Sequence, residues 1–356
     1  MARFTDVFSD ETKRGYKIQT SEYLPFGKYP IIDQGQAQIV GYTNLENGLF
    51  TDVPAIIFGD HTRIVKYVDR PFFLGADGVK VLKAKVRDTD YKYLFYCLQN
   101  AKIPNTGYNR HFKWLKDVDI PLPPLEEQCQ IAALLDKVSD LIAKRRQQLD
   151  KLDELIKARF VEMFGTEQQK KALSDICCII TDGTHQPPKF ISDGIPFLFV
   201  SNIVSNQITY ETEKYISEET YNELIKRTPI ELGDILLSTV GSYGHPAIVK
   251  EDRRFLFQRH IAYLKPKHDI VQSQYLHAAL LSNIAQRQIE SKVKGVAQKT
   301  LNLSEIRKIV LPVPPMDRQL YFCRYIEQTE KTKTTISRSL EKLETLKKAL
   351  MQEYFG

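Results

Sequence analysis

The sequence predicts an α+β protein in which two related mixed α/β domains are separated by two long helices. We expect the helices to form an antiparallel coiled coil, which would give the chain pseudo-two-fold character. Residues 121–165 reappear without a gap at residues 312–356, at a constant offset of 191 positions. The segments before each copy carry strand-like runs first and a helix near the end, a pattern typical of the α+β class. A chain that repeats itself once is expected to consist of two equivalent halves.

The duplication is clearest in the motif that opens each copy. Each copy begins Pro-x-Pro-Pro, has a glutamine four positions after the last proline, and closes on Phe-Gly. The matched residues are Pro124 with Pro315, Gln128 with Gln319, Phe164 with Phe355, and Gly165 with Gly356. Further identities are Leu149, Lys151, Leu152, Leu155, Lys157, Ala158 and Glu162, which recur as Leu340, Lys342, Leu343, Leu346, Lys348, Ala349 and Glu353. Proline marks the start and glycine the end of one long helix in each copy.

Apolar residues recur in each copy at heptad spacing, which predicts a coiled-coil seam. The seam residues are Leu135, Ile142, Leu149, Leu152 and Ile156 in the first copy, and Ile326, Ile336, Leu340, Leu343 and Leu350 in the second. Thr329 and Lys333 also fall on the second seam. Because neither seam can stay exposed to water, we expect the two helices to pack on each other. The alternative is that each is the core helix of its own domain.

Residues 1–120 and 166–311 look like two diverged versions of one domain. Each has a proline-centred apolar strand, a short strand that opens a glycine-containing loop, a longer strand and an amphipathic helix. The expected ranges are 29–32, 56–62, 72–81 and 91–100 in the first domain, and 195–198, 235–241, 255–264 and 274–292 in the second. We therefore expect four parts: a domain over 1–120, a helix over 121–165, a domain over 166–311 and a helix over 312–356.

The composition describes a soluble protein. Of the 356 residues, 42% are hydrophobic and 26% charged, and the net charge of +6 permits nucleic-acid binding without requiring it. No apolar run is long enough to span a membrane, and the N-terminus lacks a signal pattern. The five cysteines lack zinc-ligand spacing, which favours reduced thiols and a cytoplasmic location.

No catalytic motif stands in a suitable context. The sequence lacks a phosphate-binding loop, a His-Glu-x-x-His motif and a dinucleotide fingerprint. The nearest match to an amino-methyltransferase loop, Gln186-Pro-Pro-Lys189, has the wrong residues at both ends. Asp182-Gly-Thr-His185 lacks a third catalytic member, and such a loop is more often a turn. We expect a non-catalytic chain with no metal or cofactor of its own.

Polar and basic loops in both domains are candidates for contact with DNA. Base edges are read by amide, hydroxyl, imidazole and cationic side chains, and phosphates by cations and N–H groups. In the first domain the candidates are His61, Thr62, Arg63, Asn109, Arg110, His111 and Lys113. In the second they are Thr184, His185, Gln186, Lys189, Ser242, Tyr243, His245, Gln258, Arg259, His260, Gln298 and Lys299. Any single loop is more simply explained as a solvated turn. Together the loops favour DNA binding, and duplex DNA has two-fold character, as the repeated chain is expected to have. Phe112 and Trp114 are expected to join the first domain to its helix.

The order domain, helix, domain, helix, with the proline motif opening both helices, closely resembles the specificity subunit of type I restriction-modification enzymes. Residues 29–36, 41–42, 182–185 and 295–299 add shorter matches. The chain is compact for that family, because its first domain starts almost at Met1.

The resemblance implies that each domain reads one half of a bipartite site in double-stranded DNA. It also implies that the coiled coil sets the spacing between the halves and docks two methyltransferase subunits. S-adenosylmethionine would bind to those subunits, and ATP and Mg to restriction subunits that translocate and cleave DNA. Two alternatives stay open: a coiled-coil scaffold that binds proteins and not DNA, and the recognition subunit of a split methyltransferase without a nuclease.

Overall fold

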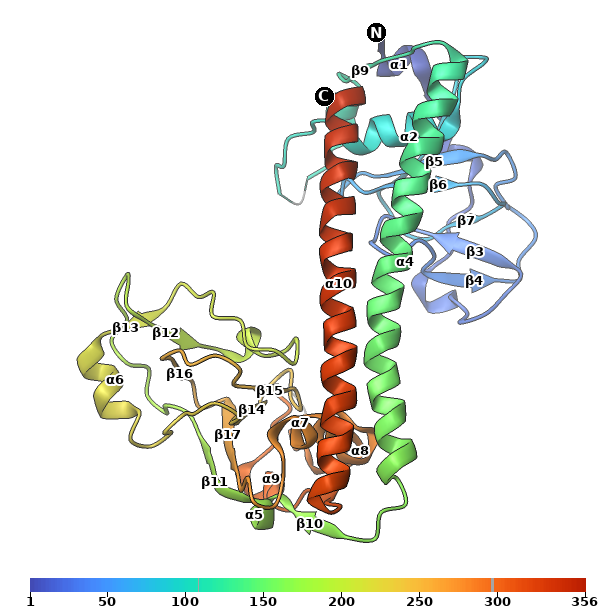
Figure 1. Ribbon diagram of the computed structural model, residues 1–356. Coiled ribbons are helices and arrows are strands. Elements are labelled where there is room, and N and C mark those ends of the chain that lie inside the picture. Colours follow the sequence, from blue (N-terminus) through green and yellow to red (C-terminus); the bar gives the residue numbers. More distant parts are fainter. Residues whose placement is uncertain (108, 296–297) are drawn as a thin grey trace. The chain divides into compact units, whose positions relative to one another are not determined.

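The computed structural model describes residues 1–107, 109–295 and 298–356. Its chain divides into two compact units (Figure 1). Unit 1 comprises Met1–Arg146 with Arg338–Gly356, and unit 2 comprises Gln147–Ser337. The two long helices, α4 (Leu125–Phe164) and α10 (Met316–Phe355), therefore each contribute one part to each unit.

The described residues of unit 1 form three small sheets. The largest is antiparallel, with the order β2 (Phe8–Asp10), β8 (Val79–Ala84), β5 (Ala55–Gly59) and β6 (Val65–Val68). The second has the order β4 (Gly41–Thr43), β3 (Tyr29–Ile32) and β7 (Phe73–Leu74), and the third pairs β1 (Ala2–Arg3) with β9 (Asp119–Ile120). The shorter helices are α1 (Phe4–Val7), α2 (Tyr91–Asn100) and α3 (Phe112–Leu115), with 3-10 turns at Thr12–Arg14 and Thr20–Glu22.

Unit 2 repeats this set of sheets. The antiparallel sheet has the order β11 (Cys177–Asp182), β17 (Ile261–Pro266), β14 (Ile235–Ser238) and β15 (Pro246–Ile248). The others are β13 (Tyr215–Ile216), β12 (Ile195–Leu198) and β16 (Leu256–Phe257), and the pair β10 (Lys170–Ala172) and β18 (Val310–Pro312). The shorter helices are α5 (Leu173–Ile176), α6 (Glu218–Leu224), α7 (Ser273–Leu281), α8 (Asn283–Lys292) and α9 (Leu303–Ile306), with a 3-10 turn at Val200–Asn202.

The strand orders of the two units correspond one to one. β2, β8, β5 and β6 match β11, β17, β14 and β15, and the parallel pair β3 with β7 matches β12 with β16. This repetition confirms the predicted class, an α+β chain with two related mixed α/β domains. Among the described residues of unit 1, no helix corresponds to α6.

Two of the predicted strands are wrong in detail. The segments 72–81 and 255–264 were expected to form one strand each, but each forms two strands in different sheets. In unit 1 the break includes Gly78, whose φ of +79° is left-handed and interrupts an extended strand. In unit 2 the break is a turn in which the Ile261 N–H donates to the Gln258 carbonyl (3.1 Å).

The expected helix over 274–292 is interrupted at Ser282. This residue has extended backbone angles (φ −68°, ψ 153°) and separates α7 from α8. Its hydroxyl accepts from the Ala285 N–H and donates to the Ala279 carbonyl (2.6 Å). The serine thus caps the second helix, a role for which serine is favoured over a helix-interior position.

The long helices pair antiparallel in each unit. Each is unbroken over 40 residues and begins directly after its proline pair. In unit 2, Asp153 of α4 forms an ion pair with Lys333 (2.7 Å), and Phe160 stacks edge-on against Phe322 (5.6 Å between ring centroids). Later residues of α4 therefore meet earlier residues of α10. Within unit 1, α4 and α10 are joined by the ion pair of Arg146 and Glu344 (2.6 Å).

Burial along the predicted seam is uneven. Leu135 and Ile142 are buried in unit 1. The half-buried seam residues are Leu149, Leu152, Ile156, Ile326, Ile336, Leu340, Leu343 and Leu350. The polar seam residue Thr329 is buried, with its hydroxyl donating to the Tyr325 carbonyl (2.9 Å).

The glutamine of the opening motif fastens the domain of unit 1 to its helix. Gln128 is buried, and its side-chain carbonyl accepts from the N–H of Asp90 (3.1 Å), the residue that caps α2. Its amide donates to the Pro123 carbonyl (2.8 Å). The Tyr93 hydroxyl of α2 also donates to the Pro121 carbonyl (3.1 Å). The start of α2 is therefore bonded both to Gln128 and to the proline motif before α4.

Unit 2 makes the same contacts. Gln319 is fully buried, accepts from the N–H of Gln272 (3.0 Å) at the start of α7, and donates to the Pro314 carbonyl (2.8 Å). Tyr275 of α7 donates to the Pro312 carbonyl (2.9 Å). The repeated proline and glutamine residues therefore have a structural role, which is to dock each domain on a long helix.

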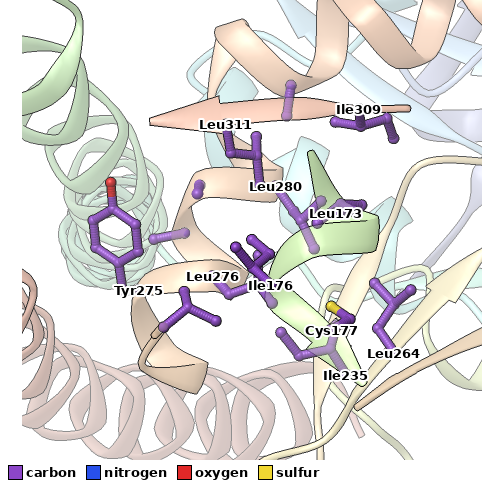
Figure 2. Close-up of a cluster of buried hydrophobic side chains, with 14 of the residues drawn as sticks. Leu173, Ile176, Cys177, Ile235, Leu264, Tyr275, Leu276, Leu280, Ile309 and Leu311 are labelled. Atoms are coloured by element: carbon purple, nitrogen blue, oxygen red, sulfur yellow. The ribbon is translucent and has the colours of Figure 1, made fainter. Parts of the chain in front are cut away.

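The main core of unit 2 lies between its antiparallel sheet and α7. Figure 2 shows Leu276 and Leu280 of α7 on the face turned toward Leu173 and Ile176 of α5. Ile235 of β14 belongs to the same buried cluster. This packing holds the ends of β11, β14 and β17 in place, and polar loops extend from those ends.

Candidate nucleic-acid interface

Polar loops of unit 1 that lie far apart in the sequence are linked by hydrogen bonds. The side chain of Gln34, from the 29–36 motif, accepts from the His61 N–H (3.1 Å) and donates to the Asp77 carbonyl (2.7 Å). The Asp60 carbonyl accepts from the His111 N–H (2.7 Å). The predicted loops around residues 61–63 and 109–113 therefore meet, together with the loop that carries Gln34.

Unit 2 joins its loops in the same way. The Thr239 N–H donates to the His260 carbonyl (2.9 Å), as the Asp60 N–H donates to Gly78 in unit 1 (2.6 Å). The Leu301 N–H donates to the Thr239 carbonyl (2.8 Å), as that of His111 donates to Asp60. The two loop sets therefore share one framework although their residues differ.

Further contacts gather the predicted residues of the second domain. The Thr184 carbonyl accepts from the Arg259 N–H (3.0 Å), and the Lys299 carbonyl accepts from the Gly241 N–H (3.1 Å). The ammonium of Lys299 lies 5.8 Å from the ring centroid of Tyr243. The loops 183–189, 239–244, 258–260 and 298–300 thus lie side by side.

Gly183 makes one of these approaches possible. A Cβ atom at this position would lie 2.3 Å from the Phe257 carbonyl oxygen and 2.5 Å from that of Gln258. Only glycine lets the 182–185 loop pack this closely on the neighbouring backbone. The Asp-Gly-Thr-His motif is therefore a packed turn that sets the position of His185.

His111 does not fit its predicted role. Its side chain is fully buried, and Nδ1 lies 3.0 Å from the Asp60 carbonyl. Its counterpart in unit 2, Leu301, is buried in the same way. His111 therefore holds the loops together from inside. A run of basic residues in the sequence does not reveal which side chain turns inward.

The other candidates of the first domain differ in exposure. Thr62, Asn109, Arg110 and Lys113 are exposed, and His61 and Arg63 are half-buried. The Thr62 hydroxyl donates to the Gln34 carbonyl (2.6 Å). Arg63 has a left-handed backbone (φ +62°) and donates to the Ile103 carbonyl (3.4 Å), which turns it toward the end of α2. Tyr108 of the 106–114 stretch lies outside the described residues.

Two lysines that the sequence pattern did not single out lie close to the Phe112 ring. The ammonium groups of Lys80 and Lys116 lie 4.9 and 5.4 Å from its ring centroid. Phe112 also packs edge-on against Phe4 (5.9 Å) and lies against the hydrophobic core of unit 1. Lys80 alternates with buried valines in its strand, and this period-two pattern could have marked it as outward-facing.

The candidates of the second domain are mostly accessible. His185, Gln186, Lys189, Ser242, Arg259, Gln298 and Lys299 are exposed, and Thr184, Tyr243, His245, Gln258 and His260 are half-buried. Burial, followed by the charge of Arg259, lowers the pKa of His260. Burial also lowers the pKa of His245, whose Nδ1 lies 3.3 Å from the amide oxygen of Asn206. Val296 and Ala297 of the 295–299 match lie outside the described residues.

A second feature missed at the sequence level follows α6. Arg227 binds the carboxylate of Asp182, and its Nη2 lies 3.1 Å from Nε2 of His185. His185 in turn lies 3.0 Å from Asp182. Lys226 and Arg227 form a dibasic pair just before Thr228-Pro229. This pair is the sequence feature that could have marked the segment as a candidate contact.

The exposed sides of α4 and α10 also repeat. Lys151, Leu155, Ala158 and Glu162, at helical spacing, are exposed, and so are their counterparts Lys342, Leu346, Ala349 and Glu353. We call these two sets the repeated stripes. Leu155 is 48% exposed and Leu346 is 46% exposed. Packing within this chain therefore does not explain why the same residues occur in both stripes.

Within the described residues, no three His, Cys, Asp or Glu side chains are grouped so that they could hold a metal ion. None of the helices formed by these residues combines the length and apolar character needed to cross a membrane.

Comparison with known proteins identifies the family. The model of the type I restriction modification DNA specificity domain matches residues 1–154 and again residues 166–346. The chain belongs to this family. The two matches coincide with the two domains and most of the two long helices, so the internal duplication is the duplication of the specificity domain.

Relatives of the specificity-domain family agree with this assignment. The chain is 26% identical to the type I restriction enzyme EcoBI specificity subunit of Escherichia coli, over 68% of this chain and 58% of that protein. It is 23% identical to the MjaVIII specificity subunit of Methanocaldococcus jannaschii, over 78% of this chain and 74% of that protein. The chain thus spans less than two-thirds of the first relative.

A solved structure shares the fold. The S subunit of a type I restriction-modification system from M. genitalium matches with a TM-score of 0.54 at 16% identity, covering 99% of this chain and 95% of that one.

Proposed function

We propose that this chain is the sequence-specific DNA-binding subunit of a type I restriction-modification complex, in which each domain reads one half of a bipartite site. The observation that carries the proposal is the shared loop framework of the two units. Equivalent hydrogen bonds from Asp60 and Thr239 gather amide, hydroxyl and cationic side chains at matching places. Such side chains contact base edges and phosphates.

The difference between the two loop sets supports separate reading of two half-sites. Unit 1 offers Asn109, Arg110 and Lys113, with Lys80 and Lys116 nearby. Unit 2 offers Gln186, Lys189, Ser242, Arg259 and Lys299. Equal frameworks with unequal side chains suit two domains that face the same kind of ligand and prefer different sequences. The reading domains would occupy residues 1–120 and 166–311.

We further propose that the long helices dock two copies of one methyltransferase subunit. The repeated stripes support this, because exposed identities at an offset of 191 present the same surface twice. Two equal surfaces suit two equal partners. S-adenosylmethionine would bind to those partners, and ATP and Mg to restriction subunits that join them. The chain itself would be non-catalytic and would act on DNA in the cytoplasm.

Co-expression of the full chain with its methyltransferase tests the proposal. We expect the purified complex to bind duplex DNA with an affinity that falls steeply as salt rises, because phosphate contacts release counterions. We also expect the complex to methylate adenine in a bipartite motif. A protein scaffold would show neither property. Co-purification of a translocating nuclease subunit would separate a complete restriction system from a split methyltransferase.

A further inference from the structure

Arg227 lies in a polar cavity that the predicted loops only partly account for. The cavity has a volume of about 570 Å³ and lies between the 183–189 loop and the end of α6. Its charged and amide lining comprises His185, Gln186, Lys189, Glu223, Lys226 and Arg227. The volume is within the range of ordinary ligand sites.

We propose that Arg227 reads the major-groove edge of a guanine in the half-site of the second domain, and that Asp182 positions it. This inference rests on the proposed DNA-binding function. It adds a specificity-determining residue and names the base that this residue recognises.

The support beneath Arg227 is rigid. Asp182 is the last residue of β11 and pairs with Ala262 of β17 in the antiparallel sheet. Its side chain is only 17% exposed, whereas that of Arg227 is 51% exposed. A carboxylate anchored in the sheet therefore holds a guanidinium that faces solvent. Such an arginine loses little side-chain entropy when it binds a ligand.

The donor geometry fits a base edge. Nη2 of Arg227 donates to Asp182 and also lies 3.1 Å from Nε2 of His185. Among the described residues, no hydrogen bond engages its Nε or Nη1. Nη1 of the guanidinium is therefore free to donate, and guanine offers O6 and N7 as acceptors in the major groove.

The charges around Arg227 favour a base over a phosphate. Asp182 neutralises much of its positive charge, and the carboxylate of Glu223 also lines the cavity. A phosphate contact depends mainly on charge and would be weakened by both carboxylates. Base recognition depends on the direction of the donors, which Asp182 improves. Lys189 and Lys226 also line the cavity, and no ion pair among the described residues includes them, so they are better placed than Arg227 to bind a phosphate.

The test compares variants of the full chain in complex with its methyltransferase, through the methylated motif and through binding to duplexes altered at single base pairs. Arg227→Ala should make one G·C pair of the second half-site degenerate, with discrimination at that pair reduced by about one to two orders of magnitude. Asp182→Asn should relax the same pair to a smaller degree. The melting temperature of both variants should stay close to that of the wild type.

Arg254→Ala is the matched control. Arg254 is another exposed arginine of unit 2, and it binds a carboxylate at the start of α6, that of Glu218. Its removal should leave the motif unchanged. If Arg227→Ala weakens binding to all sequences equally and Arg227→Lys restores it, the residue contacts a phosphate and the inference is wrong. An unchanged motif overturns it too, whereas a wild-type complex without sequence-specific binding overturns the proposed function itself.

Discussion

The side-chain carbonyl of Gln128 accepts a hydrogen bond from the backbone N–H of Asp90, at 3.1 Å. Gln128 lies in the first turns of α4 and Asp90 caps α2, so this bond joins a long helix to its domain. Gln319 repeats the contact with Gln272 in unit 2. The glutamine of the repeated motif therefore couples the domain to the helix at equivalent places.

Gln128→Ala should lower the free energy of unfolding of unit 1 by about 1–3 kcal/mol, because the buried partners lose their hydrogen bonds. Gln130→Ala, an exposed glutamine of the same helix, is the control and should change stability by less than about 0.5 kcal/mol. Thermal or urea unfolding measures both. Equal stability of the two variants would contradict the docking role of the motif.

The uneven burial of the seam predicts that alanine substitutions along it lower the free energy of unfolding by different amounts. Leu135 is fully buried in the unit 1 core, so Leu135→Ala should cost about 2–5 kcal/mol. Leu149→Ala and Leu152→Ala should cost less, because these side chains are only half-buried. Urea unfolding curves of the three variants give the order. A cost at Leu152 as large as at Leu135 would show that the centre of the seam is packed as tightly as the core of unit 1.

The repeated stripes predict that the chain binds two methyltransferase subunits, one at each stripe. Leu155→Glu or Leu346→Glu should each remove one of two methyltransferase copies, and the double variant should remove both. Both leucines are exposed, so folding should not suffer. Leu141→Glu is the control, since Leu141 is also exposed but its counterpart is Thr332. Native mass spectrometry counts the bound subunits, and a double variant that keeps two partners would rule out the stripes as docking sites.

His277 predicts a pH dependence of stability. Burial lowers the pKa of His277 to about 4, and its Nε2 donates to the carbonyls of Pro246 (3.1 Å) and Asn206 (3.3 Å). An unfolded imidazole has a pKa of about 6.5, so between these values the unfolded chain binds a proton that the folded chain does not. The free energy of unfolding of unit 2 should therefore fall as the pH drops from about 6.5 toward 4, by at most about 1.4 kcal/mol per pH unit from this group.

His277→Gln should flatten this slope, whereas His268→Gln, which removes an exposed histidine of the same unit, should leave it as in the wild type. Urea unfolding at several pH values measures the slopes. Lys250 and Glu330 are the charged groups that also act on His277, with opposite effects on its pKa. Identical slopes for the wild type and His277→Gln would show that this histidine is not the group responsible.

The sequence was sufficient to predict the structural features that depend on the spacing of residues along the chain. The heptad pattern and the proline pairs predicted α4 and α10, because a helix start after proline and an apolar seam are local properties. Residues 91–100 were likewise expected to be helical, and α2 occupies that range. The internal repeat predicted two related domains, because residues that recur at a constant offset form equivalent elements in both halves of a chain.

Features that depend on tertiary contacts were not predictable. The turn between β16 and β17 contains no glycine or proline, so nothing local separates the two strands. His111 and Arg110 are adjacent basic residues, yet one is buried and the other exposed, because only the His111 N–H and ring reach the Asp60 carbonyl. Arg227 lies 45 residues from its partner Asp182, and only the fold brings them together.

If the long helices set the spacing between the two half-sites, lengthening both should lengthen the unread spacer. Seven residues inserted after Gln147 and after Arg338 preserve the heptad phase and add about 10 Å of helix. These points lie next to the positions where the chain passes from one unit to the other. The methylated motif should then gain about 3 bp between unchanged half-sites. An unchanged spacer would leave the helices with an assembly role only.

The central claim is that two domains read two half-sites independently. The most direct test is to map N6-methyladenine in DNA of cells that express the complex, for the wild type and for two pairs of loop variants. Arg110→Ala with Lys113→Ala should relax one half-site only, and Gln258→Ala with Lys299→Ala the other only, each lost base contact costing about 1–3 kcal/mol of discrimination. A continuous motif, or a change that spreads over both half-sites with either pair of variants, would contradict the claim.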